Sequence, residues 1–152
     1  MYKAREFNKK SYDENDEYAK NKISKYLISR GHEIIEYKEN YNHDLVTKKN
    51  DKLFYFEFEV KRNYPFTKKE NYPFPTVSFL GRKKRLHHIK PYFYLILCYE
   101  TNCVVFCHSE NIFKDKYKES LNLKTYNRKG KDVMYRVPIN KCLFFSIEEH
   151  MI

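Results

Sequence analysis

The chain has 152 residues, which is the size of one domain folded around a single core. Hydrophobic residues make up 41% of it and aromatic residues 18%, so there is enough apolar material for a core, and this composition excludes intrinsic disorder. Thirty Lys and Arg residues against twenty Asp and Glu residues give a net charge of +10. That charge favours a phosphate-rich partner such as nucleic acid over the alternative, a lysine bias inherited from an AT-rich genome.

Segments that would take the chain into or across a membrane are not expected. No stretch approaches the roughly 20 apolar residues needed to span a bilayer, and residues 1–10 are too polar for a signal peptide. We therefore expect a soluble, intracellular protein, in the cytoplasm or wherever its nucleic acid resides. In such a compartment the four cysteines should be thiols: Cys98, Cys103, Cys107 and Cys142. A zinc site that includes His108 is disfavoured, because the cysteines lie in apolar runs rather than in tight paired knuckles.

The beginning of the chain predicts a helix followed by a strand. Ser11 and Glu14 have the spacing of a capping box, and apolar residues then recur at helical intervals, so we expect a helix over residues 12–30. Gly31 follows, where a left-handed C-terminal cap requires a residue without Cβ. Residues 32–37 then have the pattern of a short strand.

The next segment predicts a β-hairpin. Residues 42–47 and 53–61 are strand-like and flank a polar turn at residues 48–51. Alternation along the second strand separates an apolar face from a charged face. The apolar face carries Phe56, Phe58 and Val60, and the charged face carries Glu57, Glu59 and Lys61.

The turn of this hairpin brings another acid to the charged face. If the hairpin turns symmetrically about Asn50 and Asp51, Asp44 lies opposite Glu57 and diagonal to Glu59. Three carboxylates and a lysine then converge, and carboxylate oxygens are the ligands that Mg²⁺ prefers. The alternative is an ordinary half-exposed hairpin whose solvated face happens to alternate charges.

The second half of the chain predicts loops, strands and one more helix. Residues 62–75, with three prolines and four aromatics, are typical of an extended surface loop. Residues 81–89 favour a short basic helix that ends before Pro91. The remaining expectations are a buried hairpin over 92–99 and 103–107, a helix over 112–123, a basic turn over 127–131, and strands over 133–137 and 143–147.

At this point the sequence resembles the PD-(D/E)xK nuclease superfamily. Asp44 is followed fifteen residues later by Glu59-Val60-Lys61, which resembles the superfamily's signature. In that superfamily a leading helix precedes three strands, and the second and third strands form the hairpin that carries these residues. The size and layout are most similar to Holliday-junction resolvases and small restriction-like endonucleases, over roughly residues 12–61.

Two features depart from the motif. His43 stands where the motif has proline, a substitution that many members tolerate. Glu57 is an extra acid on the charged face, which leaves open whether it joins a metal site or holds Lys61. The leading helix of the superfamily often carries a glutamate near the site; Glu17 matches its position, with Glu14 and Asp13 as alternatives.

The resemblance implies an α/β fold with a restriction-endonuclease-like central mixed β-sheet flanked by helices, as a single domain over residues 1–152. It also implies a Mg²⁺- or Mn²⁺-dependent endonuclease acting on DNA, possible targets being junctions or other specific structures. Asp44 and Glu59 would hold one or two ions, with the carbonyl of Val60 as a further ligand. Lys61 would position the water that the metal activates, and Glu17 would be an auxiliary ligand.

Two segments are expected to contact the nucleic acid. The aromatic loop over residues 64–74 would grip the backbone and stack unpaired bases. A basic run would bind phosphates through Arg82, Lys83, Lys84 and Arg85. The alternative function is a catalytically inactive, nucleic-acid-binding accessory protein of the same fold.

A homodimer is the last expectation. The resemblance implies it, because cutting both strands of a duplex takes two sites. Fifteen Tyr and twelve Phe residues are also more than one small core readily buries, and surplus aromatics often anchor subunit interfaces. The alternative is that these aromatics stack bases or cover the surface.

Overall fold

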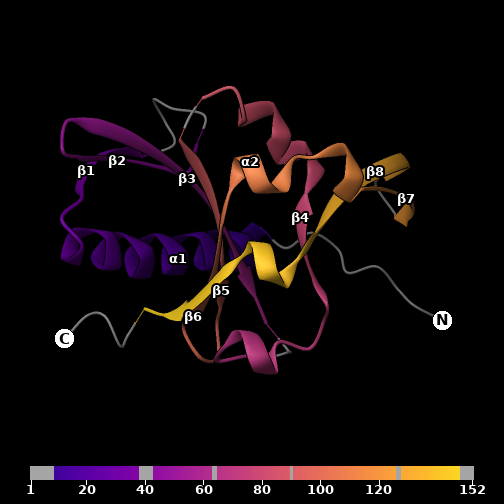
Figure 1. Ribbon diagram of the computed structural model, residues 1–152, viewed down its shortest axis with the longest axis horizontal. Helices are drawn as coiled ribbons and strands as arrows, with labels where there is room; N and C mark the ends of the chain where they lie inside the picture. The colour runs from indigo at the N-terminus through magenta and orange to yellow at the C-terminus, as the bar shows by residue number, and fades with distance from the viewer. Residues whose placement is uncertain (1–8, 38–42, 63–64, 90, 126–127, 148–152) are drawn as a thin grey trace.

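The computed structural model describes residues 9–37, 43–62, 65–89, 91–125 and 128–147. A six-stranded sheet with strand order β1-β2-β3-β5-β6-β9 forms its centre (Figure 1). Neighbouring strands in it run antiparallel except β3 and β5, which are parallel. The strands are β1 (Glu33–Tyr37), β2 (Leu45–Lys49), β3 (Lys52–Lys61), β5 (Tyr92–Cys98), β6 (Cys103–His108) and β9 (Leu143–Ser146).

A second, three-stranded sheet and several helices complete the fold. The second sheet has the order β4-β8-β7, with β4 (Thr76–Leu80), β7 (Lys118–Thr125) and β8 (Arg128–Pro138). The helices are α1 (Lys9–Ser29), α2 (Ser109–Ile112) and four 3₁₀ helices, η1 (Lys69–Asn71), η2 (Gly81–Leu86), η3 (Asp115–Tyr117) and η4 (Ile139–Lys141). Within this part of the chain, no helix is both long and apolar enough to cross a membrane.

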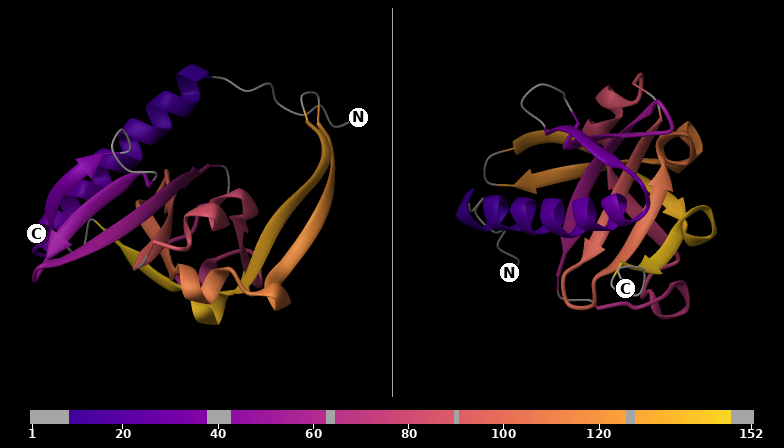
Figure 2. Two further views of the ribbon diagram at one scale, coloured as in Figure 1. Left: turned by 90° about the horizontal axis from the view of Figure 1, so that it is seen from above. Right: turned by 90° about the vertical axis from the view of Figure 1, so that its left-hand side faces the viewer.

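The central sheet is covered differently on its two faces. Helix α1 packs through Ala19, Ile23 and Leu27 against the face that carries Phe56 and Phe58. The second sheet, η2 and α2 cover the opposite face, and the left view of Figure 2 shows α1 and the β7–β8 ribbon on different sides of the molecule. The mixed α/β class is confirmed. On the second face, however, a sheet and short helices take the place where flanking helices were expected.

Only the C-terminal end of α1 agrees with the prediction from the sequence. The helix begins at Lys9, so Ser11 lies inside it and the expected capping box at Ser11 is wrong. At the other end Gly31 has φ +93°. The N–H of His32 donates to the carbonyl of Leu27 and that of Gly31 donates to Ile28, which is the Schellman cap that requires a glycine.

The hairpin of β2 and β3 has the expected register. Leu45 pairs with Phe56 and Lys49 pairs with Lys52, so the chain turns symmetrically about Asn50 and Asp51. Both turn residues have positive φ, 52° and 61°. A two-residue turn of this kind matches the twist of the strands it joins.

Residues 112–123 are not one helix, and this expectation is wrong. α2 ends at Ile112, and residues 118–125 form β7, which pairs antiparallel with β8 along its whole length. Pairing with β8, the next strand along the chain, overrides the helical pattern of the segment. Residues 128–131, expected in a basic turn, already belong to β8.

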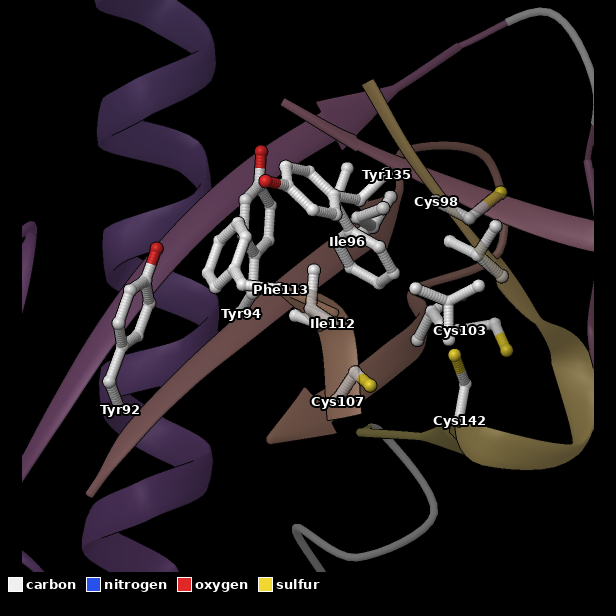
Figure 3. Packing of buried hydrophobic residues seen from close by; sticks show 14 of the residues in the cluster. Tyr92, Tyr94, Ile96, Cys98, Cys103, Cys107, Ile112, Phe113, Tyr135 and Cys142 are labelled. Atoms are coloured by element: carbon white, nitrogen blue, oxygen red, sulfur yellow. The ribbon is translucent and has the colours of Figure 1, made fainter. Parts of the chain in front are cut away.

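Buried side chains on β5 and β6 face the second sheet. Tyr92, Tyr94 and Ile96 belong to one buried cluster with Tyr135 and Ile112, and Figure 3 shows Tyr94 and Ile96 near these two residues. The four cysteines are buried free thiols of this part of the fold, as expected. The hairpin over residues 92–107 is therefore confirmed as the interior of the central sheet.

Candidate functional site

The charged face of β3 looks toward the second sheet, opposite to the face covered by α1. This face carries Glu57, Glu59 and Lys61. Along the strand these residues alternate with the apolar residues whose side chains pack on α1 from the other face. The parallel pairing of β3 with β5 sets Tyr94 beside Glu57 in register. The predicted alternation is thus confirmed, and the charged face lies largely inside the protein.

Asp44 and Glu57 form a buried carboxylate pair. Their side chains lie opposite one another when the β2–β3 register is continued by one residue, and the residues are 3% and 1% exposed. The Phe58 N–H donates to Asp44 Oδ2 at 3.1 Å and fixes that carboxylate. Burial, followed by the neighbouring Asp44 carboxylate, raises the pKa of the Glu57 carboxyl to about 9. At neutral pH Glu57 therefore keeps its proton unless a bound cation replaces it.

Lys83 supplies one positive charge to this pair. Its Nζ lies 2.9 Å from Glu57 Oε2, and the lysine side chain is only 15% exposed. η2 can hold Lys83 there because it begins at Gly81, where any Cβ would clash with the carbonyl of Val133 on β8. Glu57 Oε1 is buried and has no hydrogen-bond donor among the residues that the structure describes. When both carboxylates are ionised, one lysine leaves one negative charge to neutralise.

Glu59 and Lys61 form a second, more accessible group. Lys61 Nζ lies 2.7 Å from Glu59 Oε1, and the Tyr94 hydroxyl donates to Glu59 Oε2 at 2.9 Å. Both charged side chains are partly exposed, whereas Tyr94 is buried, and burial raises the pKa of its hydroxyl well above the usual value. Tyr94 therefore stays protonated and serves as a donor to Glu59.

His43, in the place of the motif's proline, is buried beside the carboxylates. Its ring centroid lies 4.7 Å from that of Tyr92 and 5.1 Å from that of Tyr55. Burial lowers the pKa of His43 to about 4, even though Asp44 acts in the opposite direction. The imidazole is therefore neutral at physiological pH and adds no charge to the site.

The structure divides the predicted site residues into two pairs, Asp44 with Glu57 and Glu59 with Lys61, and places Glu17 apart from both. Asp44 meets Glu57, whereas the expected partner Glu59 is paired with Lys61. The side chain of Val60 packs toward α1, so only its backbone remains to act as expected. Glu17 is exposed on α1, which covers the other face of the sheet. The side chains of Glu14 and Asp13 lie outside the described residues.

Of the residues expected to contact nucleic acid, the structure exposes some and buries others. In the basic run, Lys83 points inward to Glu57, while Lys84 and Arg85 are exposed; the side chain of Arg82 lies outside the described residues. In the aromatic loop, Phe66 is a core residue, and Phe74 is 49% exposed. Tyr64 is not among the described residues.

Sequence reasoning missed two members of the site, Lys83 as the partner of Glu57 and Tyr94 as the donor to Glu59. Both contacts join segments that are 26 and 35 residues apart. The spacing of polar residues along one strand carries no information about such partners. Comparisons with models of protein families, with curated proteins and with solved structures found no match for this chain.

The raised pKa of Glu57 predicts how stability depends on pH in the metal-free protein. Between about pH 4.5 and 9 the folded state keeps a proton on Glu57 that the unfolded chain has lost, so the free energy of unfolding falls as pH rises. Below pH 6.5 the neutral His43 acts in the opposite direction. We therefore expect a net fall between about pH 6.5 and 9, of at most about 1.4 kcal/mol per pH unit.

Urea unfolding in EDTA across this pH range measures the effect. Glu57→Gln should flatten the profile, while Glu70→Gln on exposed η1 should keep the profile of the unmodified chain. Parallel profiles for the unmodified chain and Glu57→Gln would show that Glu57 is already ionised at neutral pH.

Proposed function

We propose that the protein is a Mg²⁺- or Mn²⁺-dependent nuclease that hydrolyses phosphodiester bonds in DNA. The observation that carries the proposal is the buried pair of Asp44 and Glu57, with an oxygen of Glu57 that lacks a donor in the described part of the chain. Two adjacent buried carboxylates are costly unless a cation neutralises them. The resemblance of Asp44 and Glu59-Val60-Lys61 to the PD-(D/E)xK signature supports the same conclusion.

The residues present fit a single divalent ion. Mg²⁺ is usually bound by one or two carboxylates and completes its coordination with water and substrate phosphate oxygens. Asp44 and Glu57 would hold it; the structure groups no three His, Cys, Asp or Glu side chains for a metal within its described residues. When bound, the ion would activate water and neutralise the charge that develops on the phosphodiester.

The other residues of the site have roles of their own. Lys83 holds Glu57 in place from η2. Lys61, kept in position by Glu59 and partly exposed, would orient the attacking water or the phosphate. Glu59 is in turn held by the hydroxyl of Tyr94. Glu59 would thus act through Lys61, unless metal binding draws it toward Asp44.

Two basic features support nucleic acid as the substrate. Lys84 and Arg85 are exposed on η2, next to the lysine that binds Glu57. β7 and β8 carry six Lys and Arg residues against two acids, and they form a ribbon that stands away from the rest of the molecule (Figure 2). A two-stranded ribbon fits the major groove of B-DNA, which favours DNA as the partner.

One observation favours the alternative, a nucleic-acid-binding protein without catalysis. Lys83 already occupies Glu57 Oε2, and a lysine with a shared proton would neutralise the carboxylate pair without any metal. The same surface charges would then serve binding alone.

Cleavage assays separate the two functions. Asp44→Asn and Glu57→Gln should each reduce Mg²⁺-dependent cleavage of labelled DNA by at least about a hundredfold, because each removes a proposed metal ligand. Glu59→Gln should also reduce it, through the loss of the Lys61 contact. Glu33→Gln, an exposed acid on β1, is the matched control and should cleave normally.

Folding of each variant is verified by circular dichroism. Full cleavage by Asp44→Asn and Glu57→Gln would contradict the proposed site. Salt-dependent DNA binding by the unmodified protein, without cleavage in either Mg²⁺ or Mn²⁺, would leave the binding protein as the better function.

The exposed residues of η2 predict a salt effect on binding. Each phosphate contact releases condensed counterions, so replacing both Lys84 and Arg85 by alanine should lower the slope of log affinity against log salt by about two. Fluorescence anisotropy over a salt series measures the slope. Replacing Lys25 on α1 and Lys52 at the β2–β3 turn removes the same charge elsewhere. Equal slopes for the two double variants would exclude a specific phosphate contact at η2.

We further propose a homodimer. Leu143 is 63% exposed and borders a groove of about 430 Å³ whose lining includes Phe54, Phe93 and Phe106. A second copy would cover this apolar surface. Sedimentation equilibrium should give twice the chain mass of 18.8 kDa, and Leu143→Asp, but not Leu143→Met, should lower it. A mass near 18.8 kDa with and without DNA would rule out the dimer.

A further inference from the structure

A small pocket opens beside Lys61, on the same side of the central sheet as Glu59. Its volume is about 270 Å³, and its walls come from the end of β3, the loop over residues 65–75, and strands β4 and β8. The residues used below are Lys61, Tyr72, Phe74, Thr76, Ser78 and Arg136. The metal site proposed above does not account for this pocket.

An aromatic wall forms one side of the pocket. Phe74 is 49% exposed and meets Tyr72 edge to face, with ring centroids 5.8 Å apart. Tyr72 is held in turn by the buried ring of Phe66 at 5.0 Å and by Phe144 at 5.4 Å. The wall is therefore braced by the core, while the ring of Phe74 remains partly open to solvent.

Polar groups of two kinds complete the lining. Lys61 and Arg136 bring positive charge, and each is already oriented by an acid, Glu59 for Lys61 and Glu119 for Arg136. The half-buried residues Thr76 and Ser78 on β4 add hydroxyl groups that both donate and accept hydrogen bonds. An aromatic wall, hydroxyls and flanking cations suit a planar, hydrogen-bonding ring that carries a phosphate.

We propose that this pocket receives one unpaired nucleobase of the substrate, with the adjacent phosphate at Lys61. This inference rests on the proposed function and specifies its substrate class: single-stranded, flapped or branched nucleic acid rather than continuous duplex. The volume supports one ring system, because it lies below the roughly 300–1,000 Å³ of pockets that enclose whole drug-sized ligands. A paired base within a duplex does not present its face to Phe74.

Binding without metal tests the pocket separately from cleavage. The probes are a fluorescent single-stranded oligothymidylate, an abasic strand of equal length and a continuous duplex, all in EDTA. Phe74→Ala should weaken binding of the oligothymidylate by between about fivefold and a hundredfold, the usual effect of losing one stacked base, and leave duplex and abasic binding within twofold. Phe74→Tyr should retain affinity, and Ile28→Ala, an exposed apolar residue on α1, is the control from the opposite face.

Equal loss of affinity for all three probes, or no loss for the oligothymidylate, would contradict the proposal that the pocket binds a base. Parallel cleavage assays in Mg²⁺ keep the two proposals apart. Base-dependent binding through Phe74 without any cleavage would contradict the proposed nuclease function and support the base-binding pocket. Cleavage of continuous duplex that Phe74→Ala does not change, with no preference for unpaired substrates, would contradict the pocket and leave the nuclease.

Discussion

The buried carboxylate pair of Asp44 and Glu57 is the constraint on which the surrounding structure depends. Asp44 and Glu57 are almost fully buried, so their charges are poorly screened, and burial raises the pKa of Glu57. The β2–β3 register holds the two acids together, and the Phe58 N–H and the Lys83 ammonium fix them while relieving only part of that cost. A fold that only needed stability would gain from an apolar pair of similar volume at this position. The presence of two acids there is the main physical argument for the proposed cation.

The connection between β3 and β5 builds the surroundings of these acids. Parallel neighbours require a crossover, and this one runs through the loop over residues 65–75, β4 and η2. It delivers Lys83 to Glu57, and it also delivers Phe74 and Ser78 to the pocket beside Lys61. A single segment therefore covers the charged face of β3 and supplies both the counter-charge and the pocket wall. The same parallel pairing brings Tyr94 within reach of Glu59.

The sequence predicted features that are decided locally and failed where distant segments meet. Gly31 and the Asn50-Asp51 turn each impose a backbone conformation, so the end of α1 and the hairpin register were predictable. Residues 118–125 are an exception, because their partner β8 is the next strand along the chain, and pairing with it outweighs the segment's helical pattern. Strand β4 was missed because its partner β8 is distant in the sequence. In the site, the predicted hairpin register set Asp44 opposite Glu57, as the structure has it, whereas the motif resemblance had paired Asp44 with Glu59.

The basic run of η2 shows why charge composition alone does not assign roles. Lys83, Lys84 and Arg85 are consecutive, yet a 3₁₀ turn separates their directions, so Lys83 enters the protein while its neighbours face solvent. The inward lysine lowers the cost of the carboxylate pair but does not cancel it, because one positive charge faces two acids. With both carboxylates ionised, the buried site would repel a phosphate. A divalent ion bound there, as proposed, would reverse that repulsion at the point where a phosphodiester approaches, so metal binding and substrate binding should favour each other.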